Sequence, residues 1–356
     1  MLLYIHIPFC DSKCFYCAFN SYTDKFHLKN EYMRSLNKQL EYEIENYVKP
    51  QGLVFDTVFI GGGTPSTIKS EMYIEIFNTF KPYLKDEAEI TTEANPNSAN
   101  LEWLNGMKKL GVNRVSFGVQ SFNDEKLKKL GRSHKSKSAI EAIKNASIVG
   151  FKNGINCDII YGVAGDDLNL IKSDLSTAFS LPITHLSAYS LMIEEGTKFF
   201  DNPKMKIDDE DLSYKVFDFI EENKFKQYEI SNFSISKDYE SKHNYGYWEH
   251  KEYLGVGSGS VGYWDKKRRY PTKVIEDYVA NPFDIELEEI NEDDIKVEKI
   301  LLGFRCSNGV SMDLFNEEEL SRVNILIDDD KLEIKQDRLY NKNFLLADEL
   351  ALYIID

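Results

Sequence analysis

The feature that most constrains the fold of this chain is a regular alternation of short β-rich runs with longer segments of helical periodicity. The pattern occurs six times before residue 200, with candidate strands at 2–6, 54–60, 89–93, 114–118, 155–161 and 185–191. Amphipathic segments long enough for crossover helices lie between them, near 29–48, 68–84, 98–110, 136–149 and 168–180. Such a series predicts an α/β fold with a parallel sheet covered by helices. Because eight units close a TIM barrel, six predict an open six-stranded (βα)6 partial barrel rather than a flat doubly wound sheet.

The repeat ends near residue 204, and two further regions follow it. We expect 205–285 to extend the barrel through a helix, an aromatic-rich segment and a glycine-rich turn. The last region, 286–356, predicts a smaller mixed α/β module with two helices, a hairpin at 331–340 and a closing helix, similar in outline to a winged helix. The domain boundaries expected are therefore 1–204, 205–285 and 286–356.

Charge and hydropathy exclude some classes of protein. The formal net charge is −16, whereas contacts to phosphates need clustered Lys and Arg, so we expect no nucleic-acid partner. We interpret the one short basic cluster, at 265–270, as a solvated loop. No apolar run approaches the roughly 18 residues that cross a bilayer, so we expect no membrane insertion, although peripheral contact through a membrane-bound partner stays open. Five cysteines and a start without secretory features indicate a reducing, cytoplasmic location.

Three of the five cysteines lie within eight positions, directly after the first predicted strand. Cys10, Cys14 and Cys17 have the spacing C-x3-C-x2-C. A structural zinc usually takes four protein ligands, and the only histidine nearby, His6, lies inside the strand. A four-iron cluster held by three cysteines leaves one iron open to a substrate or cofactor. The spacing favours an iron–sulfur cluster, with zinc and structural coincidence as alternatives.

The other two cysteines match no motif. We expect Cys157 and Cys306 to be buried as small apolar side chains.

The cysteine loop resembles the signature of the radical S-adenosylmethionine (SAM) superfamily, C-x3-C-x-aromatic-C after the first strand. The resemblance implies a [4Fe–4S] cluster whose open iron is chelated by the amino and carboxylate groups of SAM. It also implies a reductant, because an electron from the cluster splits SAM to methionine and a 5′-deoxyadenosyl radical. Tyr16 matches the aromatic position beside the adenine, and loop packing is its structural alternative.

A second segment strengthens the resemblance. The second predicted strand runs into "GGGTPST", where glycines let the backbone approach a ligand and free N–H groups can bind a carboxylate. Its position is similar to that of the superfamily motif that holds the SAM amino group and carboxylate. The residues implied are Gly62, Gly63 and Thr64.

Polar residues near the ends of other strands complete this pattern. On chemistry alone, each of them could simply be satisfied by a neighbouring side chain. Their order, however, resembles that in anaerobic coproporphyrinogen dehydrogenases and their relatives. The resemblance implies that they surround SAM, with acids and amides on ribose hydroxyls and arginine on a carboxylate. These residues are Tyr4, Glu93, Gln120, Arg132 and Asp158.

Two departures from that group argue against decarboxylation. The dehydrogenases have a further cysteine two places after the third, where this chain has Phe19. They also have an N-terminal arm, whereas only nine residues precede Cys10 here. Both features resemble the heme-chaperone branch of the same group.

The heme-chaperone branch also carries an H-N-x-x-Y-W motif associated with heme binding. This chain has His243, Asn244, Tyr247 and Trp248 in that spacing. An imidazole beside aromatic surface offers heme an axial nitrogen and flat apolar walls, although a hydrogen-bonded core histidine is the structural alternative. The glycine-rich turn near Ser260 lacks the histidine that relatives often have there, so we expect no second axial histidine from it.

These resemblances imply a heme chaperone that binds a [4Fe–4S] cluster, SAM and heme, and delivers heme to an acceptor protein such as a respiratory enzyme. We expect no decarboxylase activity, while radical cleavage of SAM stays open. The alternative is an oxygen-independent coproporphyrinogen III dehydrogenase. A third interpretation, a radical SAM methylase or nucleic-acid modifier, is disfavoured by the acidic charge.

Overall fold

A computed structural model describes residues 1–207 and 209–355 of the chain. Its largest element is a sheet of twelve described strands. In chain order the strands are β1 (Leu2–Ile7), β2 (Phe55–Gly62), β3 (Leu84–Ala94), β4 (Arg114–Gln120), β5 (Ile155–Tyr161), β6 (His185–Ser190), β7 (Lys226–Gln227), β8 (Asn232–Ser234), β9 (Tyr253–Val256), β10 (Gly262–Trp264), β11 (Lys267–Pro271) and β12 (Ile285–Glu289). Their order across the sheet is β12-β11-β10-β9-β1-β2-β3-β4-β5-β6-β8-β7.

The centre of the sheet follows the sequence prediction, but its edges do not. Strands β1 to β6 are parallel neighbours in chain order, at the six predicted positions. Strand β9 adds a further parallel strand beside β1, and antiparallel strands extend both edges. The sheet is therefore wider than the six strands predicted. The extra strands are two to five residues long, too short for a period-2 pattern to appear in the sequence.

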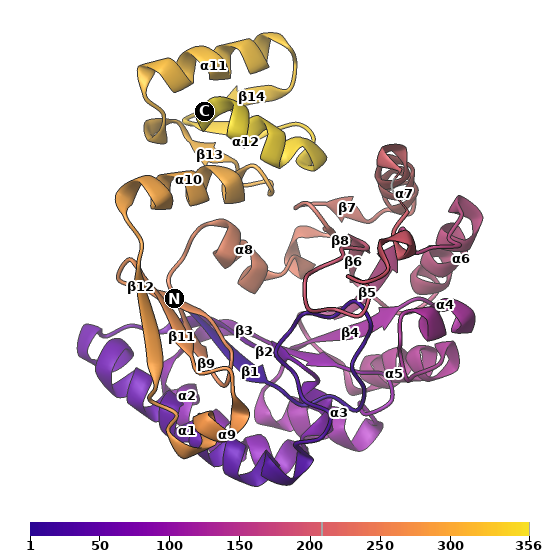
Figure 1. The fold of residues 1–356 in the computed structure, drawn as a ribbon, viewed down its shortest axis with the longest axis vertical. Coiled ribbons are helices and arrows are strands. Elements are labelled where there is room, and N and C mark those ends of the chain that lie inside the picture. Colours follow the sequence, from indigo (N-terminus) through magenta and orange to yellow (C-terminus); the bar gives the residue numbers. More distant parts are fainter. Residues whose placement is uncertain (208, 356) are drawn as a thin grey trace.

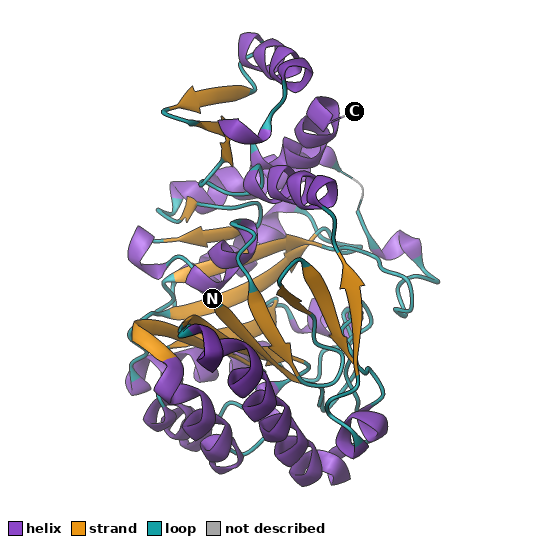
Figure 2. Cartoon of the chain, turned by 90° about the vertical axis from the view of Figure 1, so that its left-hand side faces the viewer, coloured by secondary structure: helices purple, strands orange, loops and turns teal. Residues whose placement is uncertain are grey.

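Helices from the crossovers cover one face of the sheet (Figures 1 and 2). They are α1 (Lys29–Glu43), α2 (Ile74–Phe80), α3 (Leu101–Leu110), α4 (Asp124–Lys129), α5 (Ser136–Val149) and α6 (Leu168–Phe179). Three further helices follow β6, namely α7 (Glu210–Glu222), α8 (Lys242–Trp248) and α9 (Ile275–Ala280), and α8 lies between the large sheet and the C-terminal part of the chain in Figure 1. Side-chain caps begin several of them: Asn100, Asn123 and Asp167 each accept the backbone N–H three residues ahead.

The two faces of the central strands differ in chemistry, because alternate residues point to opposite sides. In β4, Val115, Phe117 and Val119 are fully buried in the apolar core that the helices cover. The intervening Arg114, Ser116, Gly118 and Gln120 line cavities on the other face. The fold therefore buries its apolar face under helices and leaves a polar inner face on which a site can form.

A separate module follows the large sheet (Figure 1). It contains α10 (Glu292–Gly303), α11 (Glu317–Asp328) and α12 (Ala347–Ile355), with β13 (Val310–Ser311), β14 (Leu332–Lys335) and β15 (Arg338–Asn341) in the order β13-β15-β14. Strands β14 and β15 form the predicted hairpin. An apolar core of its own includes Ile300, Phe304, Val323, Leu339 and Ile354.

The basic segment at 265–270 is not the solvated loop that we expected from its charge. It forms the turn between β10 and β11 and most of β11. Arg269 is buried and pairs with Glu43 at 2.8 Å, and Arg268 contacts Glu298 at 2.6 Å. These arginines are therefore structural.

In the described part of the chain, no helix combines the length and apolarity needed to cross a membrane.

Candidate functional site

The three-cysteine loop follows β1 and lines a cavity of about 150 Å³. Cys10, Cys14 and Cys17 are all free thiols. The Cys17 N–H donates to the Cys14 carbonyl at 3.3 Å, which turns the loop back on itself. Burial raises the pKa values of the Cys10 and Cys17 thiols. The predicted ligands therefore meet at one cavity.

The three thiols do not form a compact group of ligands for a single metal ion in this structure. Among the described residues, no three His, Cys, Asp or Glu side chains form a group that could hold a metal ion. Zinc would draw its ligands to within about 2.0–2.3 Å of one point. In a four-iron cluster each cysteine binds a different iron, so its thiolates stay farther apart. The loop geometry thus gives no support to zinc.

The glycine-rich turn after β2 forms the opposite wall of the thiol cavity. Gly62, Gly63 and Thr64 all line it, and Thr64 Oγ1 lies 3.3 Å from Cys10 Sγ. The Gly63 N–H donates to the Ile7 carbonyl at 2.8 Å. A Cβ atom at Gly63 would lie 2.8 Å from that same oxygen, so a larger residue would push the turn away from the cysteine loop.

Four of the predicted polar residues also line the thiol cavity: Glu93, Gln120, Arg132 and Asp158. Burial, with the neighbouring Asp158 carboxyl, raises the pKa of Glu93 to about 8, although its Oε2 accepts the Gly62 N–H at 3.1 Å. Arg132 donates to Cys14 Sγ at 3.3 Å and to the Gly118 carbonyl. The structure therefore brings together residues from β3, β4, β5 and the connection between α4 and α5.

Two buried atoms in this wall lack hydrogen-bond partners among the described residues. They are Gln120 Oε1 and Arg132 Nε. Gln120 also has a positive φ of 69°, which a residue with a side chain seldom adopts. An unsatisfied buried polar group costs about 1–3 kcal/mol, so a ligand that donates to Gln120 and accepts from Arg132 would recover this cost. These residues fit a polar ligand such as SAM beside the thiols.

Tyr4 contributes to the site only indirectly. It lines neither cavity; its hydroxyl hydrogen-bonds His6 Nδ1 at 2.9 Å and its ring stacks on Phe59. Phe59 in turn lines a second, larger cavity beside the thiol cavity. Tyr16, by contrast, lines both cavities, as expected for a residue beside a ligand.

His243 is not brought into either cavity. It is buried, with Nδ1 2.7 Å from Thr57 Oγ1 and Nε2 3.0 Å from Tyr247 Oη. Burial is the main cause that lowers the pKa of His243 to about 3, and the positive charge of Arg114 adds to it. In the H-N-x-x-Y-W motif it is Asn244 that lines the larger cavity. Both imidazole nitrogens are thus already hydrogen-bonded inside the fold.

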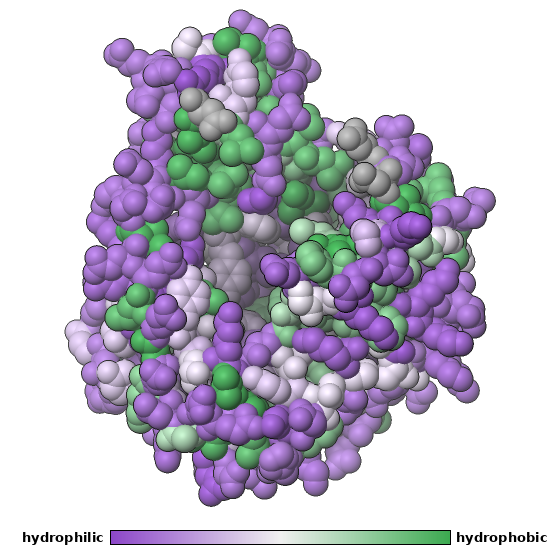
Figure 3. All heavy atoms as spheres, in the orientation of Figure 1, coloured by the Kyte–Doolittle hydropathy of each residue, from purple (hydrophilic) through white to green (hydrophobic). Residues whose placement is uncertain are grey.

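A larger cavity of about 390 Å³, which we did not predict from the sequence, adjoins the first. The two share Tyr16, Cys17, Phe19, Glu93, Gln120 and Asp158. Its rim is exposed and apolar: Phe19 is 64% exposed, Met192 68% and Tyr189 40%. The face of the molecule drawn in Figure 3 is hollowed near its centre, below the C-terminal module.

The floor of the larger cavity is polar. The Asn156 amide nitrogen lies 2.8 Å from Ser116 Oγ and 2.6 Å from Asp158 Oδ1, and its oxygen lies 2.6 Å from His185 Nδ1. Arg114 lies on the same floor. A sequence signal for these residues did exist: polar side chains at alternate positions in 114–116, 156–158 and 185–187 point to the inner face of three neighbouring strands.

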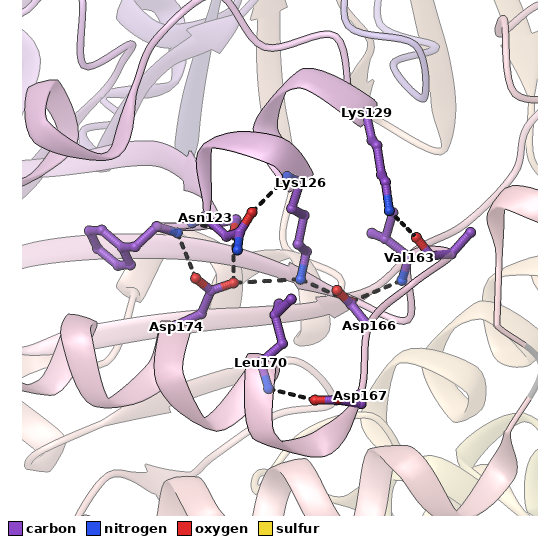
Figure 4. Close-up of polar contacts among 11 residues, drawn as sticks. Asn123, Lys126, Lys129, Val163, Asp166, Asp167, Leu170 and Asp174 are labelled. Atoms are coloured by element: carbon purple, nitrogen blue, oxygen red, sulfur yellow. Dashed lines mark hydrogen bonds and ion pairs between the residues drawn. The ribbon is translucent and has the colours of Figure 1, made fainter.

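A buried ion-pair cluster fixes the short helix between two of the site residues (Figure 4). Lys126 Nζ lies 2.9 Å from Asp166 Oδ2 and 3.6 Å from Asp174 Oδ2, and all three side chains are almost fully buried. The Val163 N–H donates to Asp166, and Phe122 N–H donates to Asp174. The cluster therefore ties α4 to the loop after β5 and to α6. Because α4 connects Gln120 to Arg132, it also fixes where both side chains can point.

Comparison with known proteins agrees with this geometry. The family model of the radical SAM superfamily matches residues 4–176. The heme chaperone HemW of Bacillus subtilis is 35% identical over 331 residues, which cover 88% of this chain and 86% of the relative. The heme chaperone HemW of Escherichia coli is 36% identical over 267 residues, which cover 73% and 69%.

A solved structure matches almost the whole fold. The Escherichia coli coproporphyrinogen III oxidase HemN, described as a radical SAM enzyme, superposes with a TM-score of 0.82 over 99% of this chain and 89% of that chain. The identity is 18%, so this match concerns the fold alone. The sequence relatives and the family model together decide membership: this chain belongs to the HemW family of the radical SAM superfamily.

Proposed function

We propose that this chain is a heme chaperone, which binds a [4Fe–4S] cluster and SAM in the smaller cavity and heme in the larger one. The observation that supports this best is the pair of adjoining cavities: one carries thiols and polar groups, and the other has an exposed apolar rim beside it. A flat apolar ligand would cover Phe19, Tyr189 and Met192 and remove their apolar surface from water. The curated relatives named above are heme chaperones.

We assign the cluster to Cys10, Cys14 and Cys17, and SAM to the residues around them. In this proposal the turn at Gly62, Gly63 and Thr64 holds the amino and carboxylate groups of SAM. The Gly62 and Gly63 N–H groups already donate to Glu93 and to the Ile7 carbonyl, so these two glycines contribute close approach of the backbone rather than free donors. Glu93, Gln120 and Asp158 hydrogen-bond polar groups of SAM, and Arg132 pairs with a carboxylate. Tyr16 lies beside the adenine, and Tyr4 orients this wall through His6 and Phe59. When bound and reduced, the cluster would supply the electron that cleaves SAM.

His243 is held inside the fold by hydrogen bonds and does not face the larger cavity. Both of its ring nitrogens are hydrogen-bonded, so ligation of heme iron by this imidazole would require the bond to Tyr247 or to Thr57 to open. We therefore propose His243 as a ligand only in a rearranged state. Asn244, the next residue, already faces the larger cavity.

The proposal extends to the architecture of the sheet, the domain boundaries, the location and the partners of the protein. We infer that β1 to β6 act as an open (βα)6 partial barrel, because they are parallel in chain order and their inner faces are polar. The separate apolar core in the C-terminal module supports a boundary near residue 286. Five free cysteines favour the reducing cytoplasm. A heme-requiring respiratory protein is the proposed acceptor, and a cellular reductant would serve the cluster.

The deciding experiment offers heme and coproporphyrinogen III in parallel to anaerobically reconstituted protein with SAM and reductant. We expect about one heme per chain by absorbance titration and no carbon dioxide or protoporphyrinogen. Decarboxylation without heme uptake would instead identify a coproporphyrinogen III dehydrogenase. Cys14→Ala is the control for the cluster: it should lose the brown chromophore and most of the iron, and full retention of iron would contradict the ligand assignment.

A further inference from the structure

Arg114, the first residue of β4, is the one charged group on the larger cavity's floor whose side chain has no ion pair or hydrogen bond among the described residues. It is only 3% exposed and lines the cavity with Ser116 and Gln120 from the same face of the strand. Its Nε atom is buried without a hydrogen-bond partner. The buried Arg269, in contrast, pairs with Glu43 at 2.8 Å.

Two acidic side chains on the strands beside β4, Glu89 of β3 and Asp158 of β5, are engaged elsewhere. The Glu89 carboxylate accepts the backbone N–H groups of Lys242 and His243, each at 3.2 Å. Asp158 accepts a hydrogen bond from the Asn156 amide at 2.6 Å, and although the Arg114 charge acts on its carboxyl, no ion pair joins the two side chains among the described residues. Because an unpaired buried guanidinium is costly, a fold that keeps one beside a cavity is arranged to receive an anion.

We propose that the floor of the larger cavity is a carboxylate-binding site in which the Arg114 guanidinium pairs with the acid group of the ligand. A planar guanidinium matches a carboxylate through two parallel N–H···O bonds. This inference rests on the proposed function in one respect: it assigns the carboxylate to a propionate of a tetrapyrrole. It adds the residue that recognises the acid end of that ligand.

The rest of the cavity agrees with such an amphipathic ligand. The rim, with Phe19, Tyr189 and Met192, is apolar, while the floor is polar and contains the Arg114 guanidinium. A ring with an apolar body and acid side chains would therefore enter with its carboxylate first. The coproporphyrinogen family of ligands shares these propionates with heme, so the site can be tested independently of which tetrapyrrole the protein carries.

The test titrates cluster-loaded, full-length protein with hemin and with coproporphyrin III, each as the free acid and as the methyl ester. The variants are Arg114→Gln and Arg114→Lys, with the exposed Arg34→Gln as the matched control. We expect Arg114→Gln to weaken binding of the free acids by about tenfold or more, and binding of the esters by less than about twofold. Arg114→Lys should fall between, and Arg34→Gln should match the parent protein.

The outcomes separate the two proposals. Equal effects of Arg114→Gln on acid and ester, or no effect on either, would overturn the carboxylate site. Parent protein that binds ester as tightly as acid would overturn it as well, even if the variant failed to fold. Binding of coproporphyrin III but not hemin would overturn the proposed heme function alone, and binding of neither would overturn both.

Discussion

Glu93 shows how burial sets the chemistry of a single residue at the site. It lies in the wall shared by the two cavities, and it combines a buried carboxyl with a second buried acid, Asp158, nearby. Its pKa is about 8, so the folded protein favours the protonated carboxyl at neutral pH. A neutral acid can donate one hydrogen bond and accept another, which suits contact with a hydroxyl group of a ligand.

The raised pKa of Glu93 predicts a pH dependence of stability. Because the folded pKa of about 8 lies above the ordinary value of 4.5, the stabilisation is complete below pH 4.5 and is lost as the pH rises toward 8. Glu93→Gln removes this dependence. The free energy of unfolding of the variant should therefore gain about 2–4 kcal/mol relative to the parent between pH 5 and pH 8, measured by urea unfolding. The control is the exposed Glu102→Gln, whose free energy of unfolding should depend on pH in the same way as that of the parent. The same result for Glu93→Gln would contradict the raised pKa of Glu93.

Substitutions of His243 and of its partner Tyr247 should have opposite effects on heme affinity. His243→Ala removes a partner from the Thr57 and Tyr247 hydroxyls and should cost about 1–3 kcal/mol of stability. If the imidazole binds heme iron, the variant also weakens heme binding while leaving the cluster iron unchanged. Tyr247→Phe is the informative counterpart, because it frees Nε2 and should tighten heme binding. Unchanged heme affinity in both variants would leave the H-N-x-x-Y-W motif a packing feature.

At the scale of elements, helix α4 is the part of the site held by buried charge. Lys126→Ala leaves two buried carboxylates, Asp166 and Asp174, without their cation and should destabilise the fold by about 3–5 kcal/mol. Because α4 joins Gln120 to Arg132, the affinity for SAM should fall in the same variant. This affinity is measured by calorimetric titration of cluster-loaded protein with SAM, at a temperature where the variant is folded. The exposed Lys128→Ala on the same helix is the control, and a destabilised variant with normal SAM affinity would show that α4 does not position the site.

The elements that the sequence predicted well share a physical origin. Strands β1 to β6 are each at least six residues long with most of their residues buried, and the cysteine loop lies in one continuous stretch. The cavity floor was missed because Arg114, Asn156 and His185 are far apart in sequence and meet only when three strands pair. The pairing of Arg269 with Glu43 joins positions 226 residues apart, so charge patterning within 265–270 could not have indicated it.

At the scale of the whole molecule, the C-terminal module is attached near the cavity floor. The Ser307 N–H donates to the Tyr228 carbonyl at 2.9 Å, and the Tyr228 hydroxyl lies 2.6 Å from His185 Nε2. Glu298 of α10 contacts Arg268 and His250, each at 2.6 Å. The module is thus connected to the floor through a few polar contacts, while its apolar core is separate from that of the large sheet.

Two apolar cores joined mainly by polar contacts predict unfolding in two steps, with the module opening first. The three tryptophans lie outside 292–355, but Trp248 lines a cavity together with Gly303 and Val310 of the module. Hydrogen exchange, which reports both parts separately, is therefore the measurement to use. Glu298→Ala should accelerate amide exchange in α10, α11 and α12 by about fivefold, since a partly exposed ion pair contributes about 1 kcal/mol or less, and should leave exchange in β1 to β6 unchanged. The exposed Lys299→Ala is the control. Equal acceleration in both parts would mean that they unfold as one unit, and the module would then act on the cavity floor only through the stability of the whole fold.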